Sequence, residues 1–132
     1  MVKNYFENEF AEFWLEDGII IEVFKPAVKE ITYEIAKKVV EDRLKFTNGV
    51  TRPIFIDMSE FRVIDKKARD YFGGEESNSL VSAAGIILHS YMAWLAGKLF
   101  LSINKPKANI QLFKTRKNAL EWLQQFVPQD QL

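Results

Sequence analysis

The residue types that carry most enzymatic chemistry are scarce in this chain of 132 residues, which has one histidine, His89, and no cysteine. Ser90 follows His89, but a nucleophilic triad needs a base, an orienting acid and a serine held together, and nothing here resembles a nucleophile elbow. Zinc sites need several ligands at recognisable spacing, which one histidine without cysteine does not supply. We therefore expect no enzyme activity, no metal site and no cofactor, with a structural role for His89.

A second set of polar residues follows the apolar run Ile54–Ile56, which is typical of a buried strand. Asp57 and Ser59 come directly after this run, where open α/β sheets usually place their binding sites. Asp65 precedes a predicted helix over Lys66–Phe72, and its carboxylate is suited to accept hydrogen bonds from the free N–H groups of the first helical turn. On chemistry alone, Ser59 as a turn former and Asp65 as a helix cap explain the pattern as well as a recognition surface does.

The stretch Asp57–Asp65 reads Asp-Met-Ser-x-Phe-x-x-Ile-Asp. It resembles the signature of the STAS domain, the fold of bacterial anti-sigma-factor antagonists, also called the SpoIIAA-like fold. The resemblance implies a regulatory or scaffolding domain that acts by protein–protein contact, with a regulatory kinase or an anti-sigma factor as its partner. It also implies that Asp57, Ser59, Asp65 and Lys66 contact that partner.

Lys66 departs from the family pattern, in which a phosphorylatable serine stands at this position. A lysine has no hydroxyl, so the serine phospho-switch implied by the resemblance is lost here. The charge of Lys66 is also opposite to that of a phosphoserine. We therefore expect a divergent bacterial member of the fold that either binds its partner constitutively or has left the phospho-switch network altogether.

The hydrophobic pattern supports the same fold. The predicted elements are strands Phe10–Leu15 and Ile19–Phe24, helix Lys29–Phe46, strand Ile54–Asp57, helix Lys66–Phe72, strand Ala83–Leu88, helix Tyr91–Ile103, strand Asn109–Phe113 and helix Arg116–Phe126. Asp17-Gly18 predicts a tight hairpin between the first two strands. Alternating strands and helices predict parallel pairing by right-handed crossovers. The sequence thus predicts an α/β fold of order β-β-α-β-α-β-α-β-α, with a mixed sheet of about five strands and an N-terminal antiparallel hairpin, as in STAS domains.

Composition limits the classes of function. The length predicts a single domain over 1–132 with its core at about 10–126, and residues 1–9 are expected to be at most partly ordered. Lys plus Arg and Asp plus Glu are equal at 18 each, which gives no reason to expect nucleic acid or an anionic membrane as a partner. The N-terminus lacks a signal-peptide pattern, and the absence of cysteine fits a reducing compartment, so we expect a cytoplasmic protein without an integral membrane segment.

The helix over Tyr91–Ile103 leaves an alternative open, because it is apolar almost all round. STAS domains resemble lipid-transfer domains of the CRAL-TRIO and SEC14 type in architecture. A small domain that binds an apolar ligand, such as a lipid, is therefore the alternative to a protein-binding role. A helix that is apolar all round is normally buried all round, and a homodimer is another way to cover it.

Overall fold

The computed structural model describes residues 4–58, 61–104 and 108–128. Its strands are β1 (Tyr5–Glu7), β2 (Ala11–Glu16), β3 (Ile19–Phe24), β4 (Glu30–Ile31), β5 (Arg52–Asp57), β6 (Val63–Ile64), β7 (Val81–Ile87) and β8 (Asn109–Phe113). Its helices are α1 (Tyr33–Thr47), α2 (Lys66–Phe72), α3 (Glu75–Asn78), α4 (Tyr91–Asn104) and α5 (Arg116–Gln124). The predicted alternation of strands and helices is confirmed.

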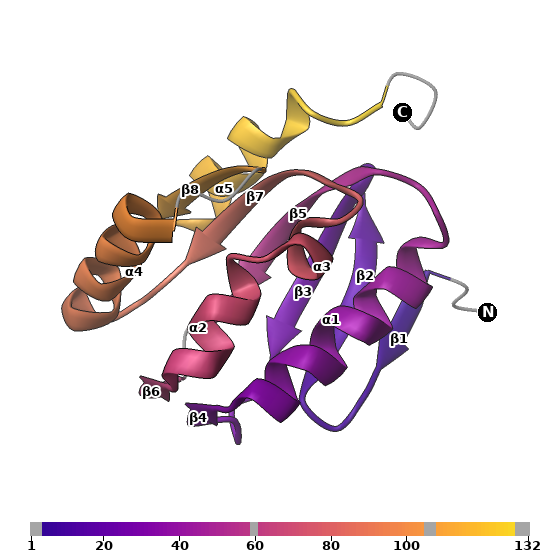
Figure 1. Cartoon of the computed structure of the whole chain (residues 1–132). Helices are drawn as coiled ribbons and strands as arrows, with labels where there is room; N and C mark the ends of the chain where they lie inside the picture. Colours follow the sequence, from indigo (N-terminus) through magenta and orange to yellow (C-terminus); the bar gives the residue numbers. More distant parts are fainter. Residues whose placement is uncertain (1–3, 59–60, 105–107, 129–132) are drawn as a thin grey trace.

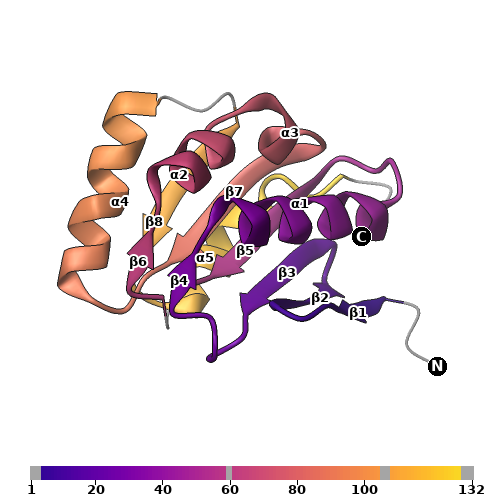
Figure 2. The same ribbon diagram turned by 60° about the horizontal axis from the view of Figure 1, so that its bottom comes forward.

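A mixed sheet of six strands, in the order β1-β2-β3-β5-β7-β8, forms the centre of the domain. Strands β1, β2 and β3 pair antiparallel, whereas β3, β5, β7 and β8 pair parallel. Helices α1, α2 and α4 lie on one face of this sheet and α5 lies on the other (Figures 1 and 2). Because both faces carry helices, the parallel strands are apolar on both sides, as their sequence predicted.

The turn chemistry follows the sequence closely. Asp17 and Gly18 both have positive φ, 50° and 85°, as a two-residue hairpin between β2 and β3 requires. Gly18 is also held close to the C-terminal segment, since a Cβ atom there would lie 2.5 Å from Cγ1 of Val127. Asn48 takes the left-handed conformation, with φ 51°, at the C-terminus of α1. Thr115 caps α5, its hydroxyl accepting from the N–H of Asn118 at 3.2 Å.

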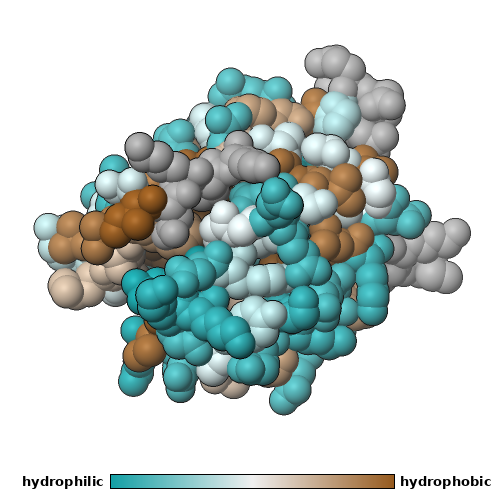
Figure 3. Space-filling model, viewed as in Figure 1, coloured by the Kyte–Doolittle hydropathy of each residue, from teal (hydrophilic) through white to brown (hydrophobic). Residues whose placement is uncertain are grey.

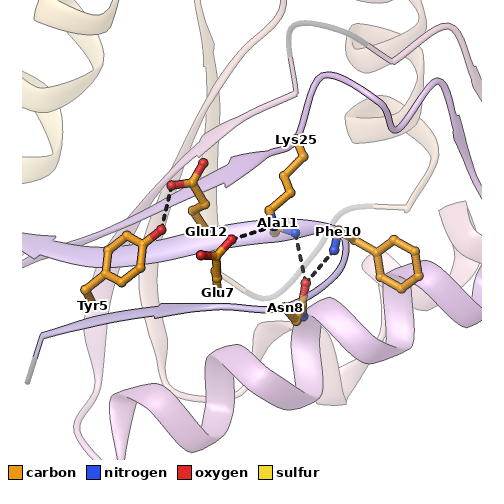
Figure 4. A network of polar contacts seen from close by, with 7 residues as sticks. All are labelled: Tyr5, Glu7, Asn8, Phe10, Ala11, Glu12 and Lys25. Atoms are coloured by element: carbon orange, nitrogen blue, oxygen red, sulfur yellow. Dashed lines mark hydrogen bonds and ion pairs between the residues drawn. The ribbon is translucent and has the colours of Figure 1, made fainter.

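The edge strand β1 was not expected from the sequence, and polar side chains hold it in place (Figure 4). The hydroxyl of Tyr5 donates to Oε1 of Glu12 at 2.8 Å, and this hydrogen bond raises the pKa of Tyr5 to about 12. Nζ of Lys25 lies 2.6 Å from Oε2 of Glu7. The side-chain oxygen of Asn8 accepts from the N–H of Ala11 at 2.9 Å in the turn that follows. Because all three β1 residues are exposed, no buried periodicity marked the strand in the sequence.

The helix predicted from Lys29 begins later than expected. Glu30–Ile31 forms the short strand β4, which pairs parallel with β6, and α1 starts at Tyr33 after a Thr32 cap. The prediction was wrong at this end because the apolar residue Ile31 fits helical spacing but pairs with Ile64 across the small sheet. This pairing fixes the start of α2, since the N–H of Asp65 donates to the carbonyl of Ile31 at 3.1 Å.

The neighbouring residues Phe13 and Trp14 on β2 face opposite sides of the sheet, as strand geometry requires. Phe13 is fully buried in the cluster under α1, while Trp14 packs against the cluster under α5. Gly85 on β7 lets α5 approach the sheet, because a Cβ there would lie 3.2 Å from Cδ1 of Leu123.

Helix α4 differs from the expectation of all-round burial. Its outer side exposes large apolar side chains (Figure 3). These are Tyr91, Met92, Leu95, Leu99 and Ile103, which are between 43% and 74% exposed. In the part of the chain that the structure describes, no helix combines the length and the apolar content needed to cross a membrane. The homodimer remains a prediction, since the exposed face shows only that this chain leaves α4 partly uncovered.

Ile87→Asp is expected to unfold the domain. Ile87 on β7 is 4% exposed in the cluster under α5. A carboxylate there loses its hydration without gaining a partner, which costs several kcal/mol, on the order of the total stability. Ile103→Asp is the control, because Ile103 is 67% exposed on α4. Circular dichroism melts check both variants, and a cooperative melt of Ile87→Asp near the wild-type temperature would contradict the placement of β7.

Candidate ligand-binding site

A cavity of about 130 Å³ lies between the sheet and the helices α2, α3 and α4. Its floor consists of strand residues that share one face of the sheet and come from β5, β7 and β8. These are Ile54, Ile56, Ala84, Ile86, Ile110 and Leu112. Met58, Phe61 and Ile64, from the segment between β5 and α2, line it as well. The cavity is therefore mostly apolar and partly enclosed.

Small side chains leave this space open. Ala84 in the floor and Ala93, Ala96 and Gly97 on α4 all border the cavity. At Gly97 the helix touches the sheet, since a Cβ there would lie 3.0 Å from Cδ1 of Leu112 and 3.1 Å from Cδ1 of Leu88. Gly97 thus sets the distance of α4 from the sheet, and the alanines do not fill the room beside it.

The charged residues Glu22 and Arg43 are buried at the edge of this mostly apolar cavity, which Arg69 also borders. Nε of Arg43 donates to Oε1 of Glu22 at 3.1 Å, and their side chains are 3% and 1% exposed. Nη1 of Arg43 also donates to the backbone carbonyl of Ser77 at 2.9 Å, which ties α3 to α1. Burial raises the pKa of the Glu22 carboxyl, while the neighbouring Arg43 guanidinium opposes that rise.

This pair was not predicted, although the sequence contains a signal for each of its residues. Glu22 interrupts an otherwise apolar strand, Ile19–Phe24. Arg43 follows Ala36 and Val39 at intervals of seven and four residues, which places it on the buried side of α1. A charged residue on each of two apolar faces is the pattern expected of a buried ion pair.

None of the three predicted partner-binding residues that the structure describes, Asp57, Asp65 and Lys66, lines this cavity. Asp57 ends β5 on the opposite face from Ile56, because successive strand side chains alternate. Asp65 caps α2, its Oδ1 accepting from the N–H of Ala68 at 2.8 Å, so the simpler of its two predicted roles is observed. The Lys66 side chain is 78% exposed and pairs with Asp70 at 2.8 Å. Ser59 lies outside the described residues.

Two other polar residues have clear positions. His89 follows β7 and is exposed, and it does not border the cavity. Arg69 on α2 is exposed and lines the cavity, so it places a cation at the rim. Within residues 4–58, 61–104 and 108–128, no three histidine or acidic side chains gather as a metal site would require.

Residues 13–127 match the family described as "Domain of unknown function (DUF7793)", and the chain belongs to this family. A solved structure, that of an uncharacterized protein of the DUF3478 family with a SpoIIAA-like fold from Shewanella loihica PV-4, is similar to this chain. The similarity covers 90% of each chain, with a TM-score of 0.59 and 15% sequence identity. No curated protein sequence matches the chain. The likeness shows that this chain has the SpoIIAA-like fold, as its sequence predicted.

Arg43→Met is expected to destabilise the domain by about 3–5 kcal/mol at neutral pH, because it leaves the Glu22 carboxylate buried without its partner. The double variant Glu22→Leu/Arg43→Met is the control and should be close to wild type, since it removes both charges. Urea unfolding of the three proteins measures the difference. Equal destabilisation of the single and double variants would contradict the pairing.

The destabilisation caused by Arg43→Met should decrease as the pH falls. Burial raises the Glu22 pKa in the folded state above its ordinary value, and the loss of Arg43 removes the opposing contribution. When the pKa of a carboxyl group is higher in the folded than in the unfolded state, its contribution to stability is fully present at pH values below the unfolded-state pKa. That contribution is lost as the pH rises through the folded-state pKa. Arg43→Met should therefore recover stability relative to wild type as the pH falls from neutral towards about 4, the ordinary range of a glutamate.

Proposed function

We propose that this domain is a non-enzymatic binding module that holds a small apolar molecule, or the apolar part of one, in the cavity under α4. The cavity itself is the observation that carries this proposal: its floor and most of its walls are apolar side chains of β5, β7, β8 and α4. Ligand sites in proteins are typically concave, largely apolar and furnished with a few polar groups. The alternative that the sequence left open, an apolar-ligand domain, is the one that this geometry favours.

The size of the cavity limits its occupant. An apolar cavity of about 150 Å³, engineered in another protein, stays dry and binds benzene. The volume here, about 130 Å³, is similar, so one ring or a short branched chain would fill it. Atoms that line an empty apolar space lack dispersion partners, and a ligand of matching shape supplies them.

The polar groups of the cavity support binding rather than catalysis. Glu22 and Arg43 are paired with each other, and no histidine is among the described residues that line the cavity. A base or nucleophile would have to be freed from this ion pair before it acted. We therefore assign no chemical reaction to this cavity.

A second candidate is the protein-binding role implied by the STAS resemblance. It is favoured by the surface at the start of α2, where Val63 is 55% exposed and the Lys66 side chain is 78% exposed. An exposed apolar side chain next to a cation suits contact with a complementary acidic protein surface. This surface is distinct from the cavity, so the two roles are separable by mutation.

Toluene tests the cavity directly. It should bind the wild-type protein and raise its melting temperature as the concentration increases, because a ligand that binds only the folded state stabilises it. Ala93→Leu places a larger side chain in the cavity and should abolish the shift while leaving the unliganded protein at least as stable. Ser102→Leu adds the same side chain to an exposed position of α4 outside the cavity and should keep the shift. Equal shifts in both variants would contradict the site.

Lys66→Glu tests the protein-binding surface. If a partner contacts Lys66, the reversed charge should weaken its recovery in a pull-down from native lysate, whereas Lys66→Ser should preserve it. Lys45→Glu on α1 is the control for a charge reversal at another exposed lysine. All variants should melt close to wild type, because exposed substitutions usually change stability by less than about 0.5 kcal/mol. Recovery of the same proteins in equal yield by all four would reject this role.

A further inference from the structure

The cavity is not uniform along its length. Glu22 on β3 and Arg43 on α1 border one end, and α4 borders the other, beyond β5 and β7. Figure 2 shows α1 and α4 at opposite ends of the same face, with α2 between them. Neighbouring strands are about 4.8 Å apart, so β3 and β8 are separated by about 14 Å. The cavity thus has a charged end and an apolar end.

The charged end retains hydrogen-bonding capacity. A guanidinium has five N–H donors and a carboxylate accepts about four hydrogen bonds. The two residues share one bond, and Arg43 makes a second to the Ser77 carbonyl. Both side chains are more than nine-tenths buried and border the cavity, so an occupant of the cavity is the group best placed to meet the rest. A buried polar group that borders an empty apolar space is well placed to bind a polar atom of an occupant.

We infer, on the basis of the proposed function above, that the occupant carries a neutral head group. This head group has both a hydrogen-bond donor and a hydrogen-bond acceptor, as a carboxamide does. Its carbonyl accepts from the Arg43 guanidinium and its N–H donates to the Glu22 carboxylate. Its apolar part lies over Ile56 and Ala84 towards α4. The ion pair thereby selects the head group and the apolar end selects the size.

The negative charge of Glu22 disfavours an anionic head group at this end of the cavity. The Glu22 carboxylate already balances Arg43 at 3.1 Å, so a second carboxylate would lie beside the first in a weakly polar space. Arg69 is the other cation of the cavity, but it is exposed at the rim, where a charge pair is worth little. A neutral head group is therefore preferred to an anion of the same shape.

Benzamide, benzoate and toluene separate these possibilities, since the first two differ mainly in charge and toluene lacks a head group. Wild-type protein should bind benzamide at least about tenfold more tightly than benzoate, as expected when one buried charge-assisted hydrogen bond is lost. Glu22→Leu/Arg43→Met should lower benzamide affinity by about tenfold more than it changes toluene affinity, because only benzamide has a head group to lose. Glu7→Gln/Lys25→Met, which removes an ion pair remote from the cavity, should behave as wild type.

A measurement on the wild-type protein avoids dependence on folding of the variant. The side-chain N–H NMR signals of Arg43 should shift on addition of benzamide and not on addition of toluene. Toluene binding without this shift, or without loss of benzamide affinity in the double variant, would overturn the inference and leave the proposed function standing. Tightest binding of benzoate, abolished by Arg69→Gln, would also overturn it. Failure of all three probes to bind would reject the proposed function itself.

Discussion

The ion pair between Glu22 and Arg43 connects three parts of the fold that are distant in sequence. It links the central strand β3 to α1 and, through the Ser77 carbonyl, to α3. Removing two charges from water is costly, so each residue depends on the other for its place in the interior. The position of α1 over the sheet is fixed by this pair together with the apolar cluster around Val39. The space that remains beyond α1 becomes the cavity.

The two faces of the sheet are covered in different ways. On one face, α5 packs closely over β5, β7 and β8, with Ala119 and Leu123 fully buried. On the other, α1, α2 and α4 share a wider surface, and α4 meets it through alanine and glycine. Small side chains at a helix–sheet contact bring the backbones together at one point and leave room beside it. One face is therefore closely packed, while the other is loosely filled and contains the cavity.

The likeness to the SpoIIAA-like fold concerns architecture, and the surface at the start of α2 shows where this chain departs from that family's pattern. The Asp65 carboxylate is engaged by the N–H of Ala68, and the Lys66 ammonium is paired with Asp70. These contacts stabilise the first turn of α2, with the cap worth about 1 kcal/mol. The motif that resembles the family signature is thus accounted for locally by the helix that it begins. A binding role at this surface depends on the exposed side chains Val63 and Lys66.

The sequence by itself determined the order of the elements, the Asp17-Gly18 hairpin and the cap at Asp65. Each of these depends on interactions between residues close in sequence or on a periodicity that one segment carries alone. The sequence did not predict β1, β4 or β6, because so few residues form these strands that no periodicity marks them. Their pairing with neighbouring strands defines them instead. Only the tertiary structure decided that Glu22 and Arg43 meet and that the alanines of β7 and α4 face a common cavity. Such contacts join positions far apart in the chain, and their geometry depends on how the helices pack against the sheet.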